Sequence, residues 1–306
     1  MAGKRKIETG RTGARTALRP GQIARLTVMD CDTGGTEVVL ETGALIEAPN
    51  WTPDGRFLIV NEGGRLFRIA ADGSSGLQEI DTGSVRKCNN DHVLSPDGKT
   101  IYISADGHLY AVPIEGGEPR RVSNVHDRGY LYFLHGVSPD NRTLAYVAVE
   151  AVGDNQWARI NIATIPAAGG KDTLLTNIDV PNDGPEYSPD GRFIYFNSEQ
   201  GADKPGHAQL FRMDANGSGI ARLTFDARVN WFPHVSPDGT RIVYLSYPPG
   251  TRGHPADLDV ILRVMPAGGG ASRDLAAFFG GQGTINVNSW APDSRRFAYV
   301  AYPIVD

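Results

Sequence analysis

Polar side chains suited to metal binding or acid–base chemistry recur a few residues ahead of a repeated Pro-Asp motif. His92 and His135 stand four residues before the motif's proline, and Glu186 and His234 stand three residues before it. Imidazole and carboxylate groups are the usual ligands of catalytic zinc, manganese or iron. If the segments that carry them converge, a divalent metal ion is the possible cofactor, and the sequence predicts as its ligands His92, His135, Glu186 and His234.

Two other interpretations stay open for these four side chains. They could act as acid and base on a polar ligand without a metal, flanked by the charged residues Asp91, Asp183, Arg86 and Arg228. They could instead bridge main-chain groups of neighbouring strands. Neighbouring strand residues point to opposite faces, so the two offsets from the proline leave open which side chains share a face. No catalytic residue is assigned, and the ligand-binding candidates are Asn90, Asp91, His92, His135, Asp183, Glu186, Trp231, His234, Asn286 and Asn288.

The motif that positions these residues occurs six times. Its prolines are Pro53, Pro96, Pro139, Pro189, Pro237 and Pro292, and the spacings between them are 43, 43, 50, 48 and 55 residues. Periods of this length are typical of propellers and solenoids. The repeat therefore predicts one continuous repeat domain rather than two separate ones, although 306 residues could form two.

Each repeat reads as four short strands. Proline presets the backbone of the turn, aspartate can bond to its own main chain, and glycine accepts a left-handed conformation, so Ser-Pro-Asp-Gly predicts a tight turn between the first two strands. A second hairpin with a glycine-rich turn follows, as in LFRMDANGSGIARLT from Leu210. We expect the motif aspartates to be turn residues rather than ligands.

The ends of the chain predict how the ring closes. The chain begins with an unaccompanied third and fourth strand from Ile23 and ends with an unaccompanied first and second strand from Trp290 to Tyr302. Together they complete a sixth blade and remove exposed sheet edges. The expected fold class is all-β, a six-bladed β-propeller over residues 21–306, with four antiparallel strands in each blade.

Unequal loops indicate which face of the propeller binds. The loops between second and third strands are short in the first two repeats and long in the next three, at residues 150–157, 199–208 and 248–258. Insertions on one face of a repeat protein usually mark its binding face. We expect these three loops to form one wall beside the channel that the first strands line.

Charge and composition narrow the possible partners and location. The net charge is −5, yet residues 1–20 contain six Lys or Arg and one Glu, which predicts a basic tail that need not be ordered. We expect no nucleic-acid partner, because the rest of the chain is acidic, and no membrane span. No apolar stretch follows the positive charges, which favours a soluble cytoplasmic protein. Cys31 and Cys88 show no pairing pattern, so we expect free thiols.

Several enzyme classes lack their motifs here. The sequence contains no G-x-S-x-G nucleophile elbow, no P-loop, no Rossmann fingerprint and no H-E-x-x-H metal motif. Glycine clusters such as Gly268–Gly270 fall in hairpin turns and not between a strand and a helix. Phosphate-cradle and serine-hydrolase functions are therefore not indicated.

The repeats resemble those of a known family. The segment from Phe211 to Gly219, followed by Arg222 to Thr224, is similar to the PD-type repeats of the TolB family of propellers. The resemblance covers residues ~21–306 and implies a six-bladed propeller. TolB itself is a periplasmic component of a bacterial envelope complex, which would imply a periplasmic location. It carries a secretion signal and a small α/β domain ahead of its propeller, and neither pattern is seen here.

These patterns lead to one expected function and one alternative. We expect a binding or interaction module that takes a protein or a small polar ligand at its loop-rich face and channel mouth. The alternative is a metal-dependent enzyme acting on a carbohydrate or another small polar substrate. Oligogalacturonate lyases resemble this chain in their Ser-Pro-Asp-Gly repeats, carry a histidine-bound metal, and have seven blades. The aromatic side chains that could stack on sugar rings are Tyr130, Tyr132, Trp157 and Trp231.

Overall fold

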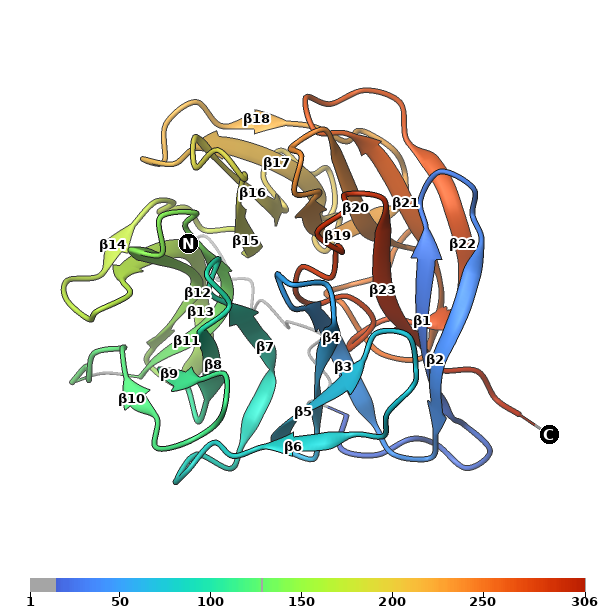
Figure 1. The fold of residues 1–306 in the computed structure, drawn as a ribbon. Coiled ribbons are helices and arrows are strands. Elements are labelled where there is room, and N and C mark those ends of the chain that lie inside the picture. Colours follow the sequence, from blue (N-terminus) through green and yellow to red (C-terminus); the bar gives the residue numbers. More distant parts are fainter. Residues whose placement is uncertain (1–14, 128, 306) are drawn as a thin grey trace.

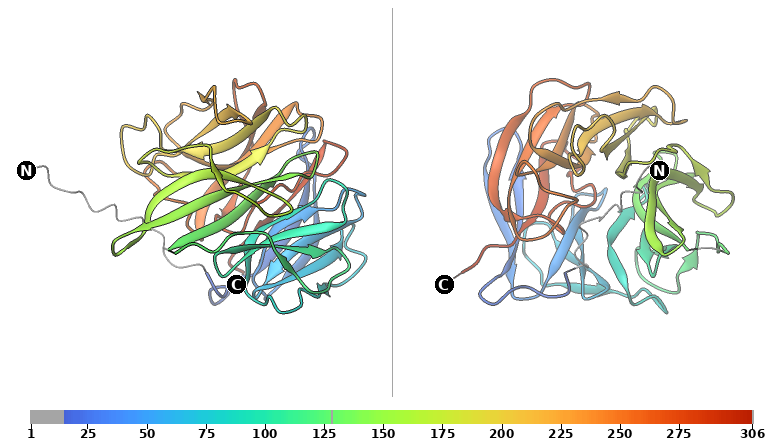
Figure 2. Two further views of the ribbon diagram at one scale, coloured as in Figure 1. Left: turned by 90° about the vertical axis from the view of Figure 1, so that its left-hand side faces the viewer. Right: turned by 180° about the vertical axis from the view of Figure 1, so that it is seen from behind.

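The computed structural model describes residues 15–127 and 129–305, and strands are the only regular secondary structure in these ranges. The strands form six antiparallel sheets, which are arranged as blades around one axis (Figure 1). Figure 2 shows the same disc from the side and from behind. The expected six-bladed β-propeller is confirmed. Residues 1–14 of the expected basic tail lie outside the described residues.

Five blades are complete four-stranded sheets in chain order. The first blade contains β3 (Ile46–Trp51), β4 (Phe57–Glu62), β5 (Arg65–Ala70) and β6 (Gln78–Ile80). The second contains β7 (Cys88–Leu94), β8 (Thr100–Ala105), β9 (His108–Pro113) and β10 (Arg120–Arg121). The third contains β11 (Tyr130–Val137), β12 (Thr143–Val152), β13 (Asn155–Pro166) and β14 (Thr173–Leu174). The fourth contains β15 (Asn182–Tyr187), β16 (Phe193–Ser198), β17 (Gln209–Asp214) and β18 (Ala221–Arg222). The fifth contains β19 (Val229–Val235), β20 (Arg241–Tyr247), β21 (Leu258–Pro266) and β22 (Arg273–Gly280).

The sixth blade joins the two ends of the chain as predicted. Strand β1 (Ala24–Asp30) pairs with β2 (Thr36–Thr42) on one side and with β23 (Arg296–Ala301) on the other. Its innermost segment is irregular and meets β23 through an isolated bridge between Trp290 and Phe297 and through main-chain hydrogen bonds that Ser289 and Thr284 accept. Asparagine side chains bond to the main chain there, as the Asn288 side chain does to the Trp290 N–H, and such bonds compete with a regular ladder.

The repeated motif forms the turn between the first two strands of each blade. In the second blade the Ser95 hydroxyl donates to Asp97 Oδ1 at 2.6 Å, and the same oxygen accepts the Lys99 N–H at 3.1 Å. Gly98 adopts φ +67°, which only glycine tolerates readily. Equivalent hydroxyl to carboxylate bonds of 2.5–2.6 Å recur in four other blades. The motif aspartates therefore act as turn residues, as expected.

The hydrophobic core lies between the blades, where neighbouring sheets pack face to face. One cluster, for example, joins Tyr102 of β8 to Tyr132 and Tyr146 of the next blade, all fully or almost fully buried. Cys31 and Cys88 are buried and free, as expected. Burial raises the pKa of the Cys88 thiol to about 11, so it is an unreactive packing residue.

The three expected long loops differ from one another. Residues 150–157 are largely strand, because β12 and β13 stay paired as far as Val152 and Asn155 and leave only a tight turn at Gly153. Gly153 and Asp154 form a two-residue hairpin turn between the paired residues Val152 and Asn155, so the ladder continues to the tip instead of ending in a loop. Residues 199–208 and 248–257 are irregular loops, as expected.

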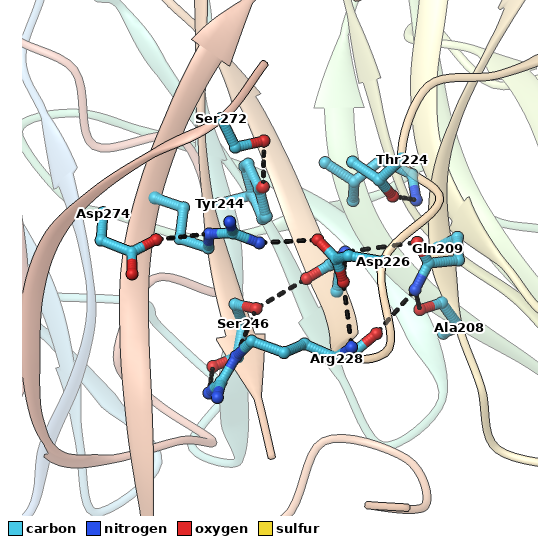
Figure 3. A network of polar contacts seen from close by, with 12 residues as sticks. Ala208, Gln209, Thr224, Asp226, Arg228, Tyr244, Ser246, Ser272 and Asp274 are labelled. Atoms are coloured by element: carbon cyan, nitrogen blue, oxygen red, sulfur yellow. Dashed lines mark hydrogen bonds and ion pairs between the residues drawn. The ribbon is translucent and has the colours of Figure 1, made fainter. Parts of the chain in front are cut away.

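A polar network connects the segment between β18 and β19 to the strands of the fifth blade (Figure 3). Arg263 of β21 donates to Asp226 Oδ2 at 2.6 Å and to Asp274 Oδ1 at 2.7 Å. His207, at the end of the loop, lies 3.0 Å from the main-chain oxygen of Asp226. Arg228 donates to the main-chain oxygen of Ser246 at 2.8 Å. These contacts join the segment between β18 and β19 to β20, β21 and β22 of the fifth blade, and His207 adds one contact from the 199–208 loop.

Candidate functional site

The predicted site residues lie at the start of the innermost strands, and strand bulges determine where they point. The ladders of β3, β15 and β19 each shift register, between Glu47 and Asn50, Asp183 and Glu186, and Trp231 and His234. Ala48, Gly184 and Phe232 sit inside these bulges with φ values of +53°, +63° and +56°. A bulge breaks the alternation of side chains. Residues on either side of it therefore need not follow the simple two-face rule.

Glu47 and Asp183, on the loop side of two of these bulges, belong to what we call the channel mouth. It comprises buried or half-buried polar residues at the entry of the innermost strands, together with one loop histidine: Glu47, Asn90, Asp91, His135, Asp183 and His254. His135 is at its centre. Its Nε2 lies 3.3 Å from Asp183 Oδ1 and 3.9 Å from Asp91 Oδ1, and its Nδ1 lies 3.1 Å from the Asn286 main-chain oxygen.

The charge state of His135 follows from these neighbours. Burial, the largest single effect, lowers its pKa, but the Asp91 and Asp183 carboxylates and the Asn286 carbonyl outweigh burial and raise the pKa above its usual value. The imidazole also stacks on Phe232, with ring centres 5.9 Å apart. The raised pKa favours the protonated, positively charged form of His135, which lies between the two carboxylates.

His254 comes from the 248–257 loop and closes one side of the mouth. Its ring packs on Trp231 and Phe232, with ring centres 4.5 and 5.1 Å apart. Its Nε2 lies 4.0 Å from Asp183 Oδ2, and its Nδ1 contacts the Gln282 side chain. The predicted ligand-binding candidate Trp231 thus works as a buried support for this histidine.

Glu47 is the most perturbed carboxyl group of the mouth. Burial raises its pKa to about 7; Arg15 opposes this rise and the neighbouring Asp91 adds to it. Asn90 bonds to the carboxyl group and favours its charged form. A carboxyl group with a pKa near neutrality changes charge readily under physiological conditions.

Arg15, which precedes the first strand, enters the mouth beside Glu47. Its Nη1 donates to Asp257 Oδ1 at 3.2 Å and its Nη2 to the Gln282 main-chain oxygen at 3.3 Å. Its Nη2 also lies 3.7 Å from Glu47 Oε1, and its guanidinium carbon lies 3.8 Å from the centre of the Tyr302 ring. Only 8% of the Arg15 side chain is exposed.

Asp257 connects this segment to the 248–257 loop. Besides Arg15, its carboxylate accepts from the Gln22 amide at 2.7 Å and pairs with Arg19 Nε at 2.9 Å. Gln22 also donates to the Tyr302 main-chain oxygen at 2.9 Å. Residues 15–22 are therefore held against the mouth chiefly by side chains.

Glu186 and His234 form a separate contact deeper in the ring. Glu186 Oε2 lies 2.6 Å from His234 Nδ1, while Oε1 accepts from the Val235 N–H and the Asn288 amide, each at 2.7 Å. His234 Nε2 lies 2.5 Å from the Ile285 main-chain oxygen. These bonds join the fourth, fifth and sixth blades. They match the interpretation in which polar side chains bridge neighbouring innermost strands.

His92 stands apart from both groups. Its ring is fully buried, and neither nitrogen makes a hydrogen bond of normal geometry within the described residues. Burial lowers its pKa to about 4, opposed by the main chain of Ile59. It is therefore neutral at physiological pH and packs as part of the interior.

The four predicted metal ligands are thus divided among three environments. The structure pairs Glu186 with His234, places His135 between Asp91 and Asp183, and isolates His92. Across residues 15–127 and 129–305, no three His, Cys, Asp or Glu side chains are arranged to hold a metal ion. Within the described residues the four side chains do not converge, because the bulges turn neighbouring positions in different directions, and a metal bound by all four stays a prediction.

Sequence reasoning missed part of the mouth. It missed Glu47, although Glu47 stands six residues before its motif proline, as Asp183 does. This shared position in the repeat was the sequence signal that could have identified Glu47. It also missed Arg15, His254 and Asp257, which lie outside the repeat and whose positions follow only from long-range contacts.

Comparison with known proteins identifies similar chains. A family model described as a TolB beta propeller domain matches residues 137–258. An uncharacterized protein of Agrobacterium fabrum is 38% identical over 295 residues, which is 94% of this chain and 96% of that protein. The Tol-Pal system protein TolB of Francisella tularensis subsp. tularensis is 24% identical over 79% of this chain and 54% of its own length.

Solved structures give the same result for the fold. A structure from Agrobacterium tumefaciens, provisionally assigned as a TolB, superposes with a TM-score of 0.85 at 38% identity and covers 93% of this chain and 99% of that one. An oligogalacturonate lyase in complex with manganese has a TM-score of 0.57 at 16% identity, covering 86% of this chain and 75% of the lyase. The lyase shares the fold alone. Among the described residues, no helix has the length and apolar character to cross a membrane.

Proposed function

Because this chain belongs to the TolB-like, PD-type repeat β-propeller family, we propose that it is a binding module whose ligand docks at the channel mouth on the loop-rich face. The observation that carries the proposal is the concentration of charge there. Glu47, Asp91 and Asp183 are buried side by side with two histidines. Glu47 and His135 both have raised pKa values, and buried titratable groups with perturbed pKa values are typical of sites that bind.

The rim of the mouth suits a protein partner. Trp157, on the extended β12–β13 hairpin, is half-buried and stacks on Phe133 with ring centres 5.5 Å apart. Half-buried aromatic side chains are common features of protein interfaces. A relative at 24% identity is a Tol-Pal system protein, so we propose proteins of a Tol-Pal system as the first partners to examine.

The metal-dependent alternative receives less support. It requires His92, His135, Glu186 and His234 around one ion, and these side chains occupy three separate environments. The likeness to the lyase is one of fold at 16% identity.

A cytoplasmic location stays a prediction, which cell fractionation of the source bacterium tests.

The proposed function is tested by partner capture with variants on both faces of the disc. We expect the Glu47→Gln/Asp183→Asn variant to lose a partner that the wild-type protein retains. The matched control is Asp140→Asn, which changes a turn carboxylate on the opposite face. Equal retention by all three proteins would place the binding surface elsewhere and reject the proposal.

A further inference from the structure

The groups around Arg15 form a receptor site whose geometry suits a guanidinium cation. A planar guanidinium group lies on the Tyr302 ring at 3.8 Å and faces the Asp257 carboxylate, the Gln282 carbonyl and the Glu47 carboxylate at 3.2, 3.3 and 3.7 Å. An aromatic ring together with several acceptors around the edge of the plane suits guanidinium. A compact ammonium group cannot reach these acceptors from one point while stacking on the ring.

The surroundings of this receptor are more acidic than its occupant is basic. Glu47, Asp91, Asp183 and Asp257 contribute four carboxyl groups to the mouth and its edge, all nearly buried. Arg15 brings one positive charge to them. Arg19 also pairs with Asp257, but 58% of its side chain is exposed, so its contribution is screened by solvent. His135 compensates Asp91 and Asp183, so the loss of Arg15 would fall on Glu47 and Asp257, and Asp257 would keep only Gln22 and the exposed Arg19 among its contacts described above.

Arg15 fills the receptor imperfectly. Its Nε is buried without a hydrogen-bond partner within the described residues, and its distance to Glu47 is 3.7 Å, whereas well-formed guanidinium–carboxylate bonds are ~2.8 Å long. A buried donor without a partner costs free energy. A second guanidinium group with freer geometry could therefore bind the same acceptors more favourably.

The segment that carries Arg15 is also weakly attached. Residues 15–19 form no strand, and the first ladder-like contact among the described residues is the isolated bridge between Gln22 and Ile304. Leu18 packs against the core and Arg19 Nε contacts Asp257. Because side chains rather than a sheet hold this segment, it can leave the mouth without unfolding a blade.

We propose that the channel mouth is an arginine-binding site, that Arg15 occupies it in the free chain, and that an arginine side chain of a protein partner replaces Arg15. The inference rests on the proposed binding function and specifies the chemistry of its ligand. Arg15 on a short tether competes at an effective concentration on the order of millimolar. A partner arginine therefore displaces Arg15 when the partner's other contacts with the rim add affinity.

The test uses the full chain with Arg15→Ala and the probe N-acetyl-arginine amide, followed by titration calorimetry. If Arg15 keeps the site occupied most of the time, its removal strengthens apparent binding about tenfold or more over the wild-type protein. N-acetyl-lysine amide should bind at least about tenfold more weakly than the arginine probe. The Arg25→Ala variant, which removes an exposed arginine of β1 that pairs with Glu41 away from the mouth, should bind the arginine probe as the wild-type protein does.

A second variant keeps the test decisive. Arg15→Ala combined with Asp257→Asn should lose the gain, and circular dichroism with thermal melting confirms that each variant is folded. Equal binding of the arginine probe to wild-type and Arg15→Ala proteins, or equal binding of arginine and lysine probes, overturns the inference.

The inference and the proposed function fail in different ways. If Arg15→Ala gains no arginine binding while Glu47→Gln/Asp183→Asn still loses its partner, the arginine site is wrong and the binding function stands. If arginine binds Arg15→Ala tightly while partner capture is unchanged by the mouth variants, the arginine site stands and the proposed docking position is wrong.

Discussion

Glu186 Oε2 lies 2.6 Å from His234 Nδ1, although the two residues are 48 positions apart and belong to neighbouring blades. The other oxygen of the same carboxylate accepts from the Val235 main chain and from Asn288 of the sixth blade. One side chain thereby connects three blades at the inner edge of the ring. Its environment assigns Glu186 a structural role.

Replacing Glu186 should therefore lower the stability of the whole propeller. Glu186→Ala leaves the Val235 N–H without its acceptor, removes the partner of His234 Nδ1, and leaves the Asn288 amide only the Val235 main-chain oxygen, so we expect a loss of about 3 kcal/mol in the free energy of unfolding. Urea unfolding at fixed pH measures it. The exposed Glu37→Ala variant should change stability by less than about 0.5 kcal/mol. Comparable small losses in both variants would contradict the structural role.

Glu47 should make stability depend on pH near neutrality. Its pKa rises from 4.5 to about 7 on folding, so between these values the folded state holds a proton that the unfolded state lacks. Stability then falls as pH increases through this window. Glu47→Gln removes this pH dependence. As the pH is raised from 5 to 8, the free energy of unfolding of the variant should therefore increase by up to about 3 kcal/mol relative to that of the wild-type protein. Chemical unfolding of both proteins across this range is the measurement, and parallel curves would argue against it.

His135 should titrate above the usual range for histidine. Since its pKa is raised, its contribution to stability is fully present below the unfolded value of 6.5 and is lost as pH increases through the folded value. NMR titration of the imidazole protons should show this high pKa, and Asp183→Asn should lower it. Asp190→Asn changes a turn carboxylate in the same blade and should leave the titration unchanged. An unaltered curve for Asp183→Asn would contradict the ion pair.

The polar network between the fourth and fifth blades should depend on the shape of arginine. Arg263 bridges Asp226 and Asp274 with different nitrogens of one planar group, and a lysine can reach only one of them at this geometry. We expect Arg263→Lys to cost about 1 kcal/mol, because both carboxylates are partly exposed. Arg65→Lys, at an exposed pair with Glu79, is the matched control and should be near neutral. Urea unfolding compares the two, and equal effects would mean that the bridge adds nothing.

Part of the candidate site could be inferred before the structure. Asp183 and His135 belong to the mouth, as the repeat positions suggested. Glu186 and His234 do contact one another, but as a bridge between blades and not as ligands of a shared ion. Bulges with positive φ at Ala48 and Phe232 redirect the residues after them. A sequence shows alternation and offers little signal for an irregular bulge at a non-glycine residue.

The sequence by itself determined the number of blades, the turn in each blade and the closure of the ring, because these depend on local and periodic chemistry. Ser-Pro-Asp-Gly specifies its own turn through neighbouring atoms, as the Ser95–Asp97 bond shows. Only the tertiary structure placed Arg15 against Asp257 and Tyr302, 242 and 287 positions away. No periodic pattern encodes that contact, since it depends on where a non-repeating segment and a non-repeating loop meet once the ring has closed.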